Sequence, residues 1–329
     1  MKRREFIALA GGAAAWPLSV RAQFPERMRR IGVLMGYSEN DPEAQNRLAA
    51  FTQGLVALGW SEGRNLRSDI RWAAGDKDHT AVLAKELVAL QPEVILSNTT
   101  PVTAALQRET HSIPLVFVIV SDPVGSGFVK SLSRPGGNIT GFINLEASLA
   151  QKWVELLKEI APSVTKTAVM FNPDTAPYAA YYIQPLQVAA AAFGVSPFAA
   201  PVRSEHDIEA AIAALGREPG NGLVLMTDSF IHVHRKTIIE LSSRHKVPTM
   251  GYGDIITRDG GLISYGIDSA DLFARAAPYV DRILRGANPA ELPVEQPTKF
   301  ELMINLKTAK ELGLTVSPAL FARANEVVE

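Results

Sequence analysis

The chain has 329 residues, of which 47% are hydrophobic, 20% are charged and 7% are aromatic. This composition excludes a disordered or collagen-like chain, and the length allows two packed cores, because single cores tend to divide beyond roughly 250 residues. The 33 basic and 34 acidic residues give a formal charge of -1, so no overall basic field attracts the protein to nucleic acid. The chain has no cysteine, which excludes disulfides, cysteine-ligated metal centres and thiol catalysis.

Residues 1–22 have the pattern of an export signal. Basic residues that include Arg3 and Arg4 form its start, an apolar stretch covers 6–20, and small residues precede a cleavage point after Ala22. The apolar stretch is shorter than the roughly 20 residues of a membrane span. The arginine pair resembles a twin-arginine signal, and the general secretory route stays open as the alternative. We therefore expect a mature chain that is released into the periplasm and is not inserted in the membrane.

From residue 30 onward, short apolar runs alternate with helical patterns. Asp41 followed by Pro42 is typical of a helix start, with an N-cap acid and a proline at the first helical position. The apolar runs are too short and too rich in β-branched residues for helices. The pattern predicts strands at 31–35, 94–96 and 115–120, and helices that begin at 42 and cover 79–90 and 101–109. Alternation of this kind builds a parallel sheet covered by helices.

A second block repeats this alternation after the sequence RPGG at 134–137. The pattern predicts strands at 167–171, 223–226 and 247–250, and helices at 178–193, 207–215 and 231–245. Two open α/β sheets in one chain imply two lobes, and such sheets bind ligands beyond the carboxyl ends of their strands. We therefore expect the loops after the strands of both lobes to converge on one cleft that closes by a hinge motion.

The loops after the predicted strands carry polar and aromatic side chains. Thr99 and Thr100 precede a helix start at Pro101, where free backbone amides favour a ligand carboxylate, and simple helix capping is an equal alternative. Asp228, or else Asp122, is expected to meet a ligand ammonium group, although both also fit a helix cap. Tyrosine and phenylalanine side chains are expected to supply the walls. The predicted ligand-binding residues are Tyr37, Ser38, Asn98, Thr99, Thr100, Asp122, Asn172, Tyr178, Asp228, Phe230, Tyr252 and Asp254.

No strong enzymatic motif occurs in the sequence. The patterns GxxxxGK[ST], HExxH and GxSxG, which serve nucleotide, zinc and serine-hydrolase chemistry, are absent. His232 and His234 lie two residues apart on a predicted helix and so point to different sides, which favours a solvated helix face over a metal site. We therefore expect no catalytic residues, no metal and no cofactor, and a binding function instead of an enzyme.

Four motifs carry a resemblance to a known family, namely IPLVF at 113–117, SDPVGSG at 121–127, RPGGNITG at 134–141 and INLKTAK at 304–310. In order and spacing they resemble the ABC transporter substrate-binding protein family related to the tryptophan-binding protein TrpX. The resemblance implies a type I periplasmic binding protein fold. This is an α/β fold with two open doubly wound (Rossmann-like) parallel-sheet lobes joined by a three-crossover hinge.

The resemblance also implies where the chain passes between the lobes. The implied crossovers lie near 138–142, 261–267 and 288–293. The implied division is a signal peptide at 1–22, an N-terminal lobe of 23–141 plus 264–288, and a C-terminal lobe of 142–263 plus 289–329.

The function implied by the resemblance is that of a periplasmic substrate-binding protein of an ABC importer. Its ligand would be a small polar organic solute, namely an amino acid, aromatic amino acids included, or a related carboxylate. Its partner would be a membrane permease. We expect a monomer, and the charge balance predicts no nucleic-acid partner. Two alternatives stay open: a periplasmic sensing adaptor for a receptor or kinase, and an exported enzyme that uses the same cleft. The motifs are mainly structural turns, so they do not identify the ligand or the permease.

Overall fold

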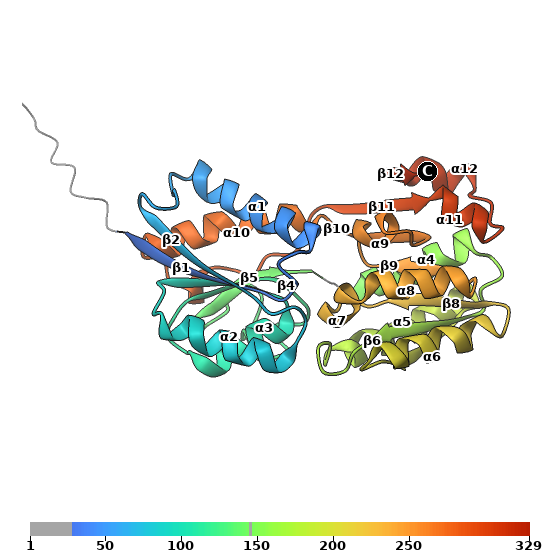
Figure 1. The fold of residues 1–329 in the computed structure, drawn as a ribbon, viewed down its shortest axis with the longest axis horizontal. Coiled ribbons are helices and arrows are strands. Elements are labelled where there is room, and N and C mark those ends of the chain that lie inside the picture. The colour runs from blue at the N-terminus through green and yellow to red at the C-terminus, as the bar shows by residue number, and fades with distance from the viewer. Residues whose placement is uncertain (1–27, 145–146) are drawn as a thin grey trace, which may run out of the picture.

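The computed structural model describes residues 28–144 and 147–329, so the expected export signal at 1–22 lies outside the described residues. Within the described ranges the chain forms two α/β lobes that lie side by side, each built on an open sheet (Figure 1). No helix in these ranges is long and apolar enough to cross a membrane.

The first lobe is a five-stranded parallel sheet with the strand order β2-β1-β3-β4-β5. Its elements are β1 (Arg29–Met35), α1 (Pro42–Ala57), β2 (Leu66–Trp72), α2 (Lys77–Ala89), β3 (Val94–Asn98), α3 (Thr100–Glu109), β4 (Leu115–Val120), β5 (Ile139–Ile143) and α10 (Ser269–Leu284). The helices α1 and α10 pack on one face of this sheet, and α2 and α3 pack on the other. Because helices cover both faces, β3 and β4 are buried along their full length and have almost continuous apolar sequences.

The second lobe is a seven-stranded sheet with the order β12-β11-β10-β9-β8-β6-β7, in which only the β10–β11 pair is antiparallel among the described strand pairs. Its helices are α4 (Ala147–Ile160), α5 (Ala179–Ala190), α6 (Glu205–Gly216), α7 (Ser229–Val233), α8 (Arg235–Arg244), α9 (Asp254–Arg258), α11 (Leu306–Glu311) and α12 (Pro318–Arg323). Its strands are β6 (Lys166–Phe171), β7 (Ser196–Pro201), β8 (Asn221–Leu225), β9 (Thr249–Gly251), β10 (Ile263–Ile267), β11 (Phe300–Asn305) and β12 (Glu326–Val328). Two short 3-10 helices, η1 (Ala191–Phe193) and η2 (Pro289–Glu291), complete the chain. This arrangement confirms the expected fold class of two doubly wound lobes.

The chain crosses between the lobes three times (Figure 1). The first crossing leads from β5 to α4, the second from β10 to α10, and the third from the segment after η2 to β11. Before the third crossing Glu295 still pairs with the first sheet, because its amide donates a hydrogen bond to the carbonyl of Gly141 at 2.9 Å. The expected lobe boundaries therefore need correction: 142–143 and 289–295 lie with the first lobe, and 264–267 lies in the second sheet.

Most of the predicted elements are confirmed with small shifts at their ends, and the differences have physical reasons. The edge strands β2 and β7 have no apolar run in their sequences, because β2 carries charged residues and β7 contains two prolines. The helix predicted over 231–245 is two helices, α7 and α8. The chain turns between them at His234, whose φ and ψ of -92° and 8° are not helical.

Candidate functional site

A pocket lies between the two lobes at the crossings. It is lined by Tyr37, Arg47, Ile119, Asn144, Leu149, Trp153, Thr227, Tyr252, Gly253, Asp254, Ile255, Gly266, Ile267 and Ser269. The free space in it is about 20 Å³, which is enough for a single water molecule. An organic solute therefore enters only when the lobes separate and the lining side chains rearrange around it.

Aromatic side chains from both lobes form the walls of the pocket. Tyr37 follows β1 in the first lobe, whereas Trp153 on α4 and Tyr252 after β9 belong to the second. The indole Nε1 of Trp153 donates a hydrogen bond to the carbonyl of Tyr265 at 2.6 Å, which fixes the ring. Gly266 leaves room for the Tyr252 loop, because a Cβ at position 266 would lie 1.7 Å from the carbonyl oxygen of Tyr252. The pocket thus presents large, rigid ring surfaces to a ligand.

Among the described residues, Arg47 is the one cation that lines this pocket. It lies on the buried face of α1, three residues after Ala44 and four before Phe51, and only 3% of its surface is exposed. Its Nε donates a hydrogen bond to Glu43 Oε1 at 3.2 Å, and its guanidinium lies 5.1 Å from the centre of the Tyr37 ring. Its Nη1 is buried and has no hydrogen-bond partner among the described residues.

His232 joins the two lobes beside the pocket. Its ring centre lies 4.2 Å from that of Tyr37, its Nδ1 is 2.9 Å from the hydroxyl of Tyr252, and its Nε2 is 3.4 Å from Asp41 Oδ2. Burial lowers the pKa of His232 to about 4, although the neighbouring Asp41 opposes this shift. The expectation of a solvated helix face is wrong for His232, because α7 points this side chain into the interface between the lobes.

An ion pair also crosses the interface. Arg235 Nη1 donates to Asp41 Oδ2 at 2.6 Å, and Arg235 Nε donates to Asp259 at 2.8 Å. Asp41 additionally caps α1 by accepting hydrogen bonds from the amides of Glu43 and Ala44. Burial opposes ionisation of Asp41, but the neighbouring His232, the hydrogen bond from the Ala44 amide and the charge of Arg235 hold its pKa well below its usual range.

Asp228, the expected partner of a ligand ammonium group, has a different place in the structure. Its carboxylate accepts hydrogen bonds from the amides of Asn172 at 2.6 Å and Phe230 at 2.9 Å, and from the hydroxyl of Thr175. Burial raises its pKa to about 6 even though these bonds oppose the shift. Asp228 therefore joins the loop after β6 to the start of α7 and does not line the pocket. The acid that lines it is Asp254, whose Oδ2 accepts a hydrogen bond from Arg258 Nε at 3.2 Å.

The segment that ends β3 also differs from the expectation. The helix α3 begins at Thr100 instead of Pro101, and Thr100 Oγ1 accepts a hydrogen bond from the amide of Ser121 at 3.1 Å instead of capping α3. Thr99 is the N-cap residue, makes no side-chain cap and has a φ of +83°. Ile119 at the end of β4 has a φ of +60°. Non-glycine residues with positive φ are uncommon and concentrate at functional sites, and of these two residues Ile119 lines the pocket.

The other predicted site residues hold the loops around the pocket and do not line it. Asn98 Oδ1 accepts from the amide of Gly36 at 3.3 Å, Asp122 Oδ1 from Gly125 at 2.8 Å, and Asn172 Oδ1 from Asp174 at 2.8 Å. The hydroxyl of Tyr178 donates to the carbonyl of Thr227, the ring of Phe230 lies 4.3 Å from that of His234, and the carbonyl of Ser38 accepts from the amide of Asp41 at 3.1 Å. Of the predicted set, the pocket is lined by Tyr37, Tyr252 and Asp254.

Sequence reasoning missed several residues of the interface, although one of them carries a readable signal. Arg47 occupies a position in the apolar stripe of α1 where its neighbours at three and four residues' distance are buried. A charge on such a stripe indicates a buried partner or ligand. Arg235, His232 and Trp153 carry no such signal, because their positions depend on how the two lobes meet.

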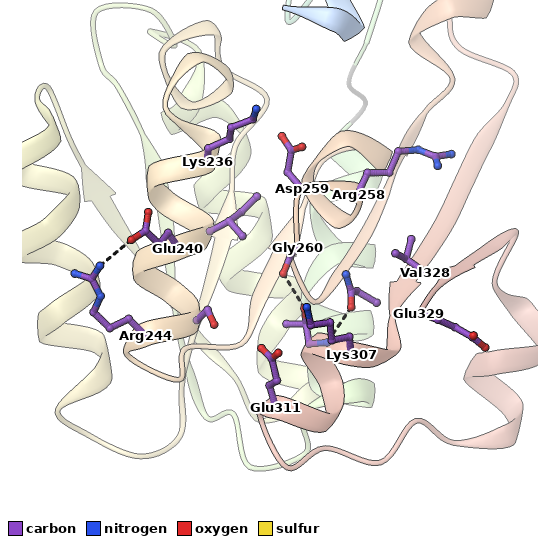
Figure 2. Close-up of a pocket in the computed structure, with 14 residues that line it drawn as sticks. Lys236, Glu240, Arg244, Arg258, Asp259, Gly260, Lys307, Glu311, Val328 and Glu329 are labelled. Atoms are coloured by element: carbon purple, nitrogen blue, oxygen red, sulfur yellow. Dashed lines mark hydrogen bonds and ion pairs between the residues drawn. The ribbon is translucent and has the colours of Figure 1, made fainter.

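A larger hollow of about 740 Å³ lies on the second lobe alone, between α8, α11 and the end of the chain (Figure 2). Lys236 and Lys307 face it together with the acids Glu240 and Glu311. Glu240 is held by Arg244 at 2.8 Å. Because both cations and acids line this hollow, its charge favours neither anionic nor cationic ligands. The interface between the lobes remains the candidate site.

Comparisons with known proteins agree with this architecture. A sequence model of the family described as ABC transporter substrate binding protein matches residues 39–328. A tyrosine-binding protein of Clostridioides difficile (strain R20291) is 25% identical over 276 residues, which are 83% of this chain and 78% of that protein.

Two solved structures each cover 92% of this chain and 100% of their own chain, both with a TM-score of 0.85. One is the ABC domain from Streptococcus pneumonia in complex with L-Trp, at 26% identity, and the other is a conserved domain protein from Vibrio cholerae, at 30% identity. These similarities confirm the type I periplasmic binding protein fold. The chain therefore belongs to the ABC transporter substrate-binding protein family, a family of solute-binding proteins and not of enzymes.

Proposed function

We propose that this protein binds an aromatic amino acid between its lobes and delivers it to the permease of an ABC importer. The observation that carries the proposal is the pocket itself, in which rings of both lobes lie around the cation Arg47 and the acid Asp254. Tyr37, Trp153 and Tyr252 suit an aromatic side chain, and Arg47 and Asp254 suit the charged groups of an amino acid. The related tyrosine-binding protein and the relative solved with L-Trp support the same ligand class.

The contacts between the lobes support binding by closure. With the lobes closed, Asp41 and Arg235 form an ion pair across the interface, and His232 lies against Tyr37 and near Asp41. The pocket is too small for an amino acid, so binding begins from a state in which these contacts are broken. A ligand that then contacts both lobes adds to the free energy of closure. A permease that recognises the closed arrangement would receive only loaded protein.

The cellular location of the protein, its monomeric state and its permease partner belong to the same proposal. The export signal expected at 1–22 would place the mature protein in the periplasm, where it would act as a monomer and meet a membrane permease. We favour transport over sensing because the family is described as substrate-binding proteins of ABC transporters.

The experiment is a calorimetric titration of the purified protein with L-tyrosine and L-tryptophan, with D-ribose as a solute of another class. We expect one site per chain for at least one of the amino acids and none for the sugar. At 100 times its dissociation constant, that amino acid should stabilise the folded protein by about 2.7 kcal/mol, which raises the melting temperature. Binding of the sugar alone, or of none of the three, would contradict the proposed ligand class.

A further inference from the structure

Arg47 lines the pocket, and its guanidinium has a donor without a partner among the described residues. Its Nη1 is buried and has no partner among the described residues, although the side chain is only 3% exposed. An ionised donor that is removed from water without a partner is costly to the folded protein. A buried cation in this state therefore indicates a group that arrives from outside the chain.

The contacts of Arg47 with Glu43 and Tyr37, which include a side-chain hydrogen bond with Tyr37, leave Nη1 for that group. Glu43 occupies Nε at 3.2 Å, and the ring of Tyr37 lies under the guanidinium at 5.1 Å. Asp254 lines the same pocket, but its carboxylate is held by Arg258 at 3.2 Å. Among the described residues no acid therefore accepts a hydrogen bond from Nη1, and Arg47 itself lines the space between the lobes.

We propose that Arg47 is the residue that binds the carboxylate of the ligand and so selects acids over the corresponding amines. Arginine presents parallel N–H donors that match the two oxygens of a carboxylate, and a lysine at the same place would offer a point charge without this geometry. The inference rests on the proposed function for the place of the ligand. It moves the carboxylate site from the start of α3, where Thr99 and Thr100 were expected to hold it, to α1.

The ligand class follows from this assignment. An aromatic side chain lies among Tyr37, Trp153 and Tyr252, and the carboxylate lies on Arg47. L-Tryptophan and 3-indolepropionate both carry the ring and the carboxylate, whereas tryptamine carries the ring and the ammonium group only. Arg47 therefore separates the two acids from the amine.

The test is calorimetry of the purified protein with L-tryptophan, 3-indolepropionate and tryptamine, for the unmodified chain, Arg47→Gln and Arg47→Lys. We expect the unmodified protein to bind tryptamine at least about 100-fold more weakly than L-tryptophan, since lost charge-assisted contacts in a desolvated site have effects of this size. Arg47→Gln should lose roughly 100-fold in affinity for both acids, and Arg47→Lys should recover only part of it. The control is Arg285→Gln, because Arg285 also pairs with an acid one helical turn away, Asp281, but lies outside the pocket.

The outcomes separate this inference from the proposed function. If the unmodified protein binds L-tryptophan and Arg47→Gln binds it equally well, the role of Arg47 is wrong while the ligand class stands. If the unmodified protein binds none of the three compounds and neither aromatic amino acid of the calorimetric test, both are wrong. Circular dichroism checks that Arg47→Gln is folded. If it is not, equal affinities of the unmodified protein for L-tryptophan and tryptamine would overturn the inference.

Discussion

Arg235 on α8 of the second lobe donates a hydrogen bond from Nη1 to Asp41 Oδ2 at the start of α1 in the first lobe, at a distance of 2.6 Å. Their side chains are 5% and 8% exposed, so both charges are withdrawn from water when the lobes are together. Opening the lobes returns them to water. The pair therefore contributes to the balance between the open and closed arrangements.

Asp41→Asn should shift this balance toward the open arrangement. Asparagine keeps an oxygen for the amides of Glu43 and Ala44, so the cap of α1 is retained, but the charge that faces Arg235 is lost. Because opening the lobes rehydrates Arg235, the loss appears in the position of the lobes more than in unfolding. We expect a larger radius of gyration by X-ray scattering and a ligand affinity at least about tenfold lower, which corresponds to 1.4 kcal/mol.

The matched control is Asp76→Asn, since Asp76 caps α2 in the same way but is exposed and has no partner in the second lobe among the described contacts. Equal radii of gyration and equal affinities for the two variants would show that the ion pair does not influence closure.

The stability of the protein should depend on His232 at mildly acidic pH. Its pKa is about 4 in the folded protein and about 6.5 in an unfolded chain. Between these values the unfolded state binds the extra proton, so the free energy of unfolding falls as the pH falls from 6.5 to 4, by up to about 3 kcal/mol. Urea unfolding of His232→Gln across this range should lack this part of the decrease. Parallel curves for the variant and the unmodified protein would contradict the buried, neutral state of His232.

Trp153 should report ligand binding by its fluorescence. The described residues contain three tryptophans, of which Trp153 lines the pocket while Trp60 and Trp72 lie in the first lobe outside it. With excitation at 295 nm, titration with L-tyrosine should change the emission of the unmodified protein and of Trp60→Phe. Trp153→Phe should lose the change, and its lost hydrogen bond to Tyr265 should cost about 1 kcal/mol of stability. A ligand-dependent signal that persists in Trp153→Phe would place the ligand elsewhere.

Gly266→Ala should disturb the wall of the pocket, because the added Cβ would lie 1.7 Å from the carbonyl oxygen of Tyr252. Since a carbonyl oxygen cannot remain so close to a Cβ, the Tyr252 loop must move, and we expect a loss of roughly 2 kcal/mol or more in urea unfolding. Gly253→Ala is the comparison, as a Cβ there meets no atom within 4 Å. Similar losses of stability in both variants would refute the close approach of β10 to this loop.

Much of the fold follows from the sequence because its strands are buried on both faces. The run LVFVIV of β4 and the N-cap Asp41 before Pro42 are local signals that need no tertiary information. The edge strands β2 and β7 gave no such signal, since one side of each has no strand neighbour. The crossings were displaced by a few residues because Glu295 pairs with Gly141, a contact between distant parts of the chain.

The site was harder to predict because the positions of its residues depend on how the two lobes meet, which local sequence patterns do not show. The rule that ligands lie beyond strand ends selected Tyr37, Tyr252 and Asp254, which line the pocket. The same rule selected Asp228, whose carboxylate is occupied by hydrogen bonds within its own lobe. Arg47 was missed because it lies on a helix face, and the candidate residues predicted from the sequence came only from the loops that follow strands.

A crystal structure of the protein grown with L-tryptophan or L-tyrosine tests the central claim most directly. The account predicts that the ligand lies between the lobes, with its ring among Tyr37, Trp153 and Tyr252 and its carboxylate on Arg47. A ligand found in the hollow of the second lobe beside Lys236 and Lys307, or one whose carboxylate lies on the start of α3 with Arg47 turned away, would contradict it.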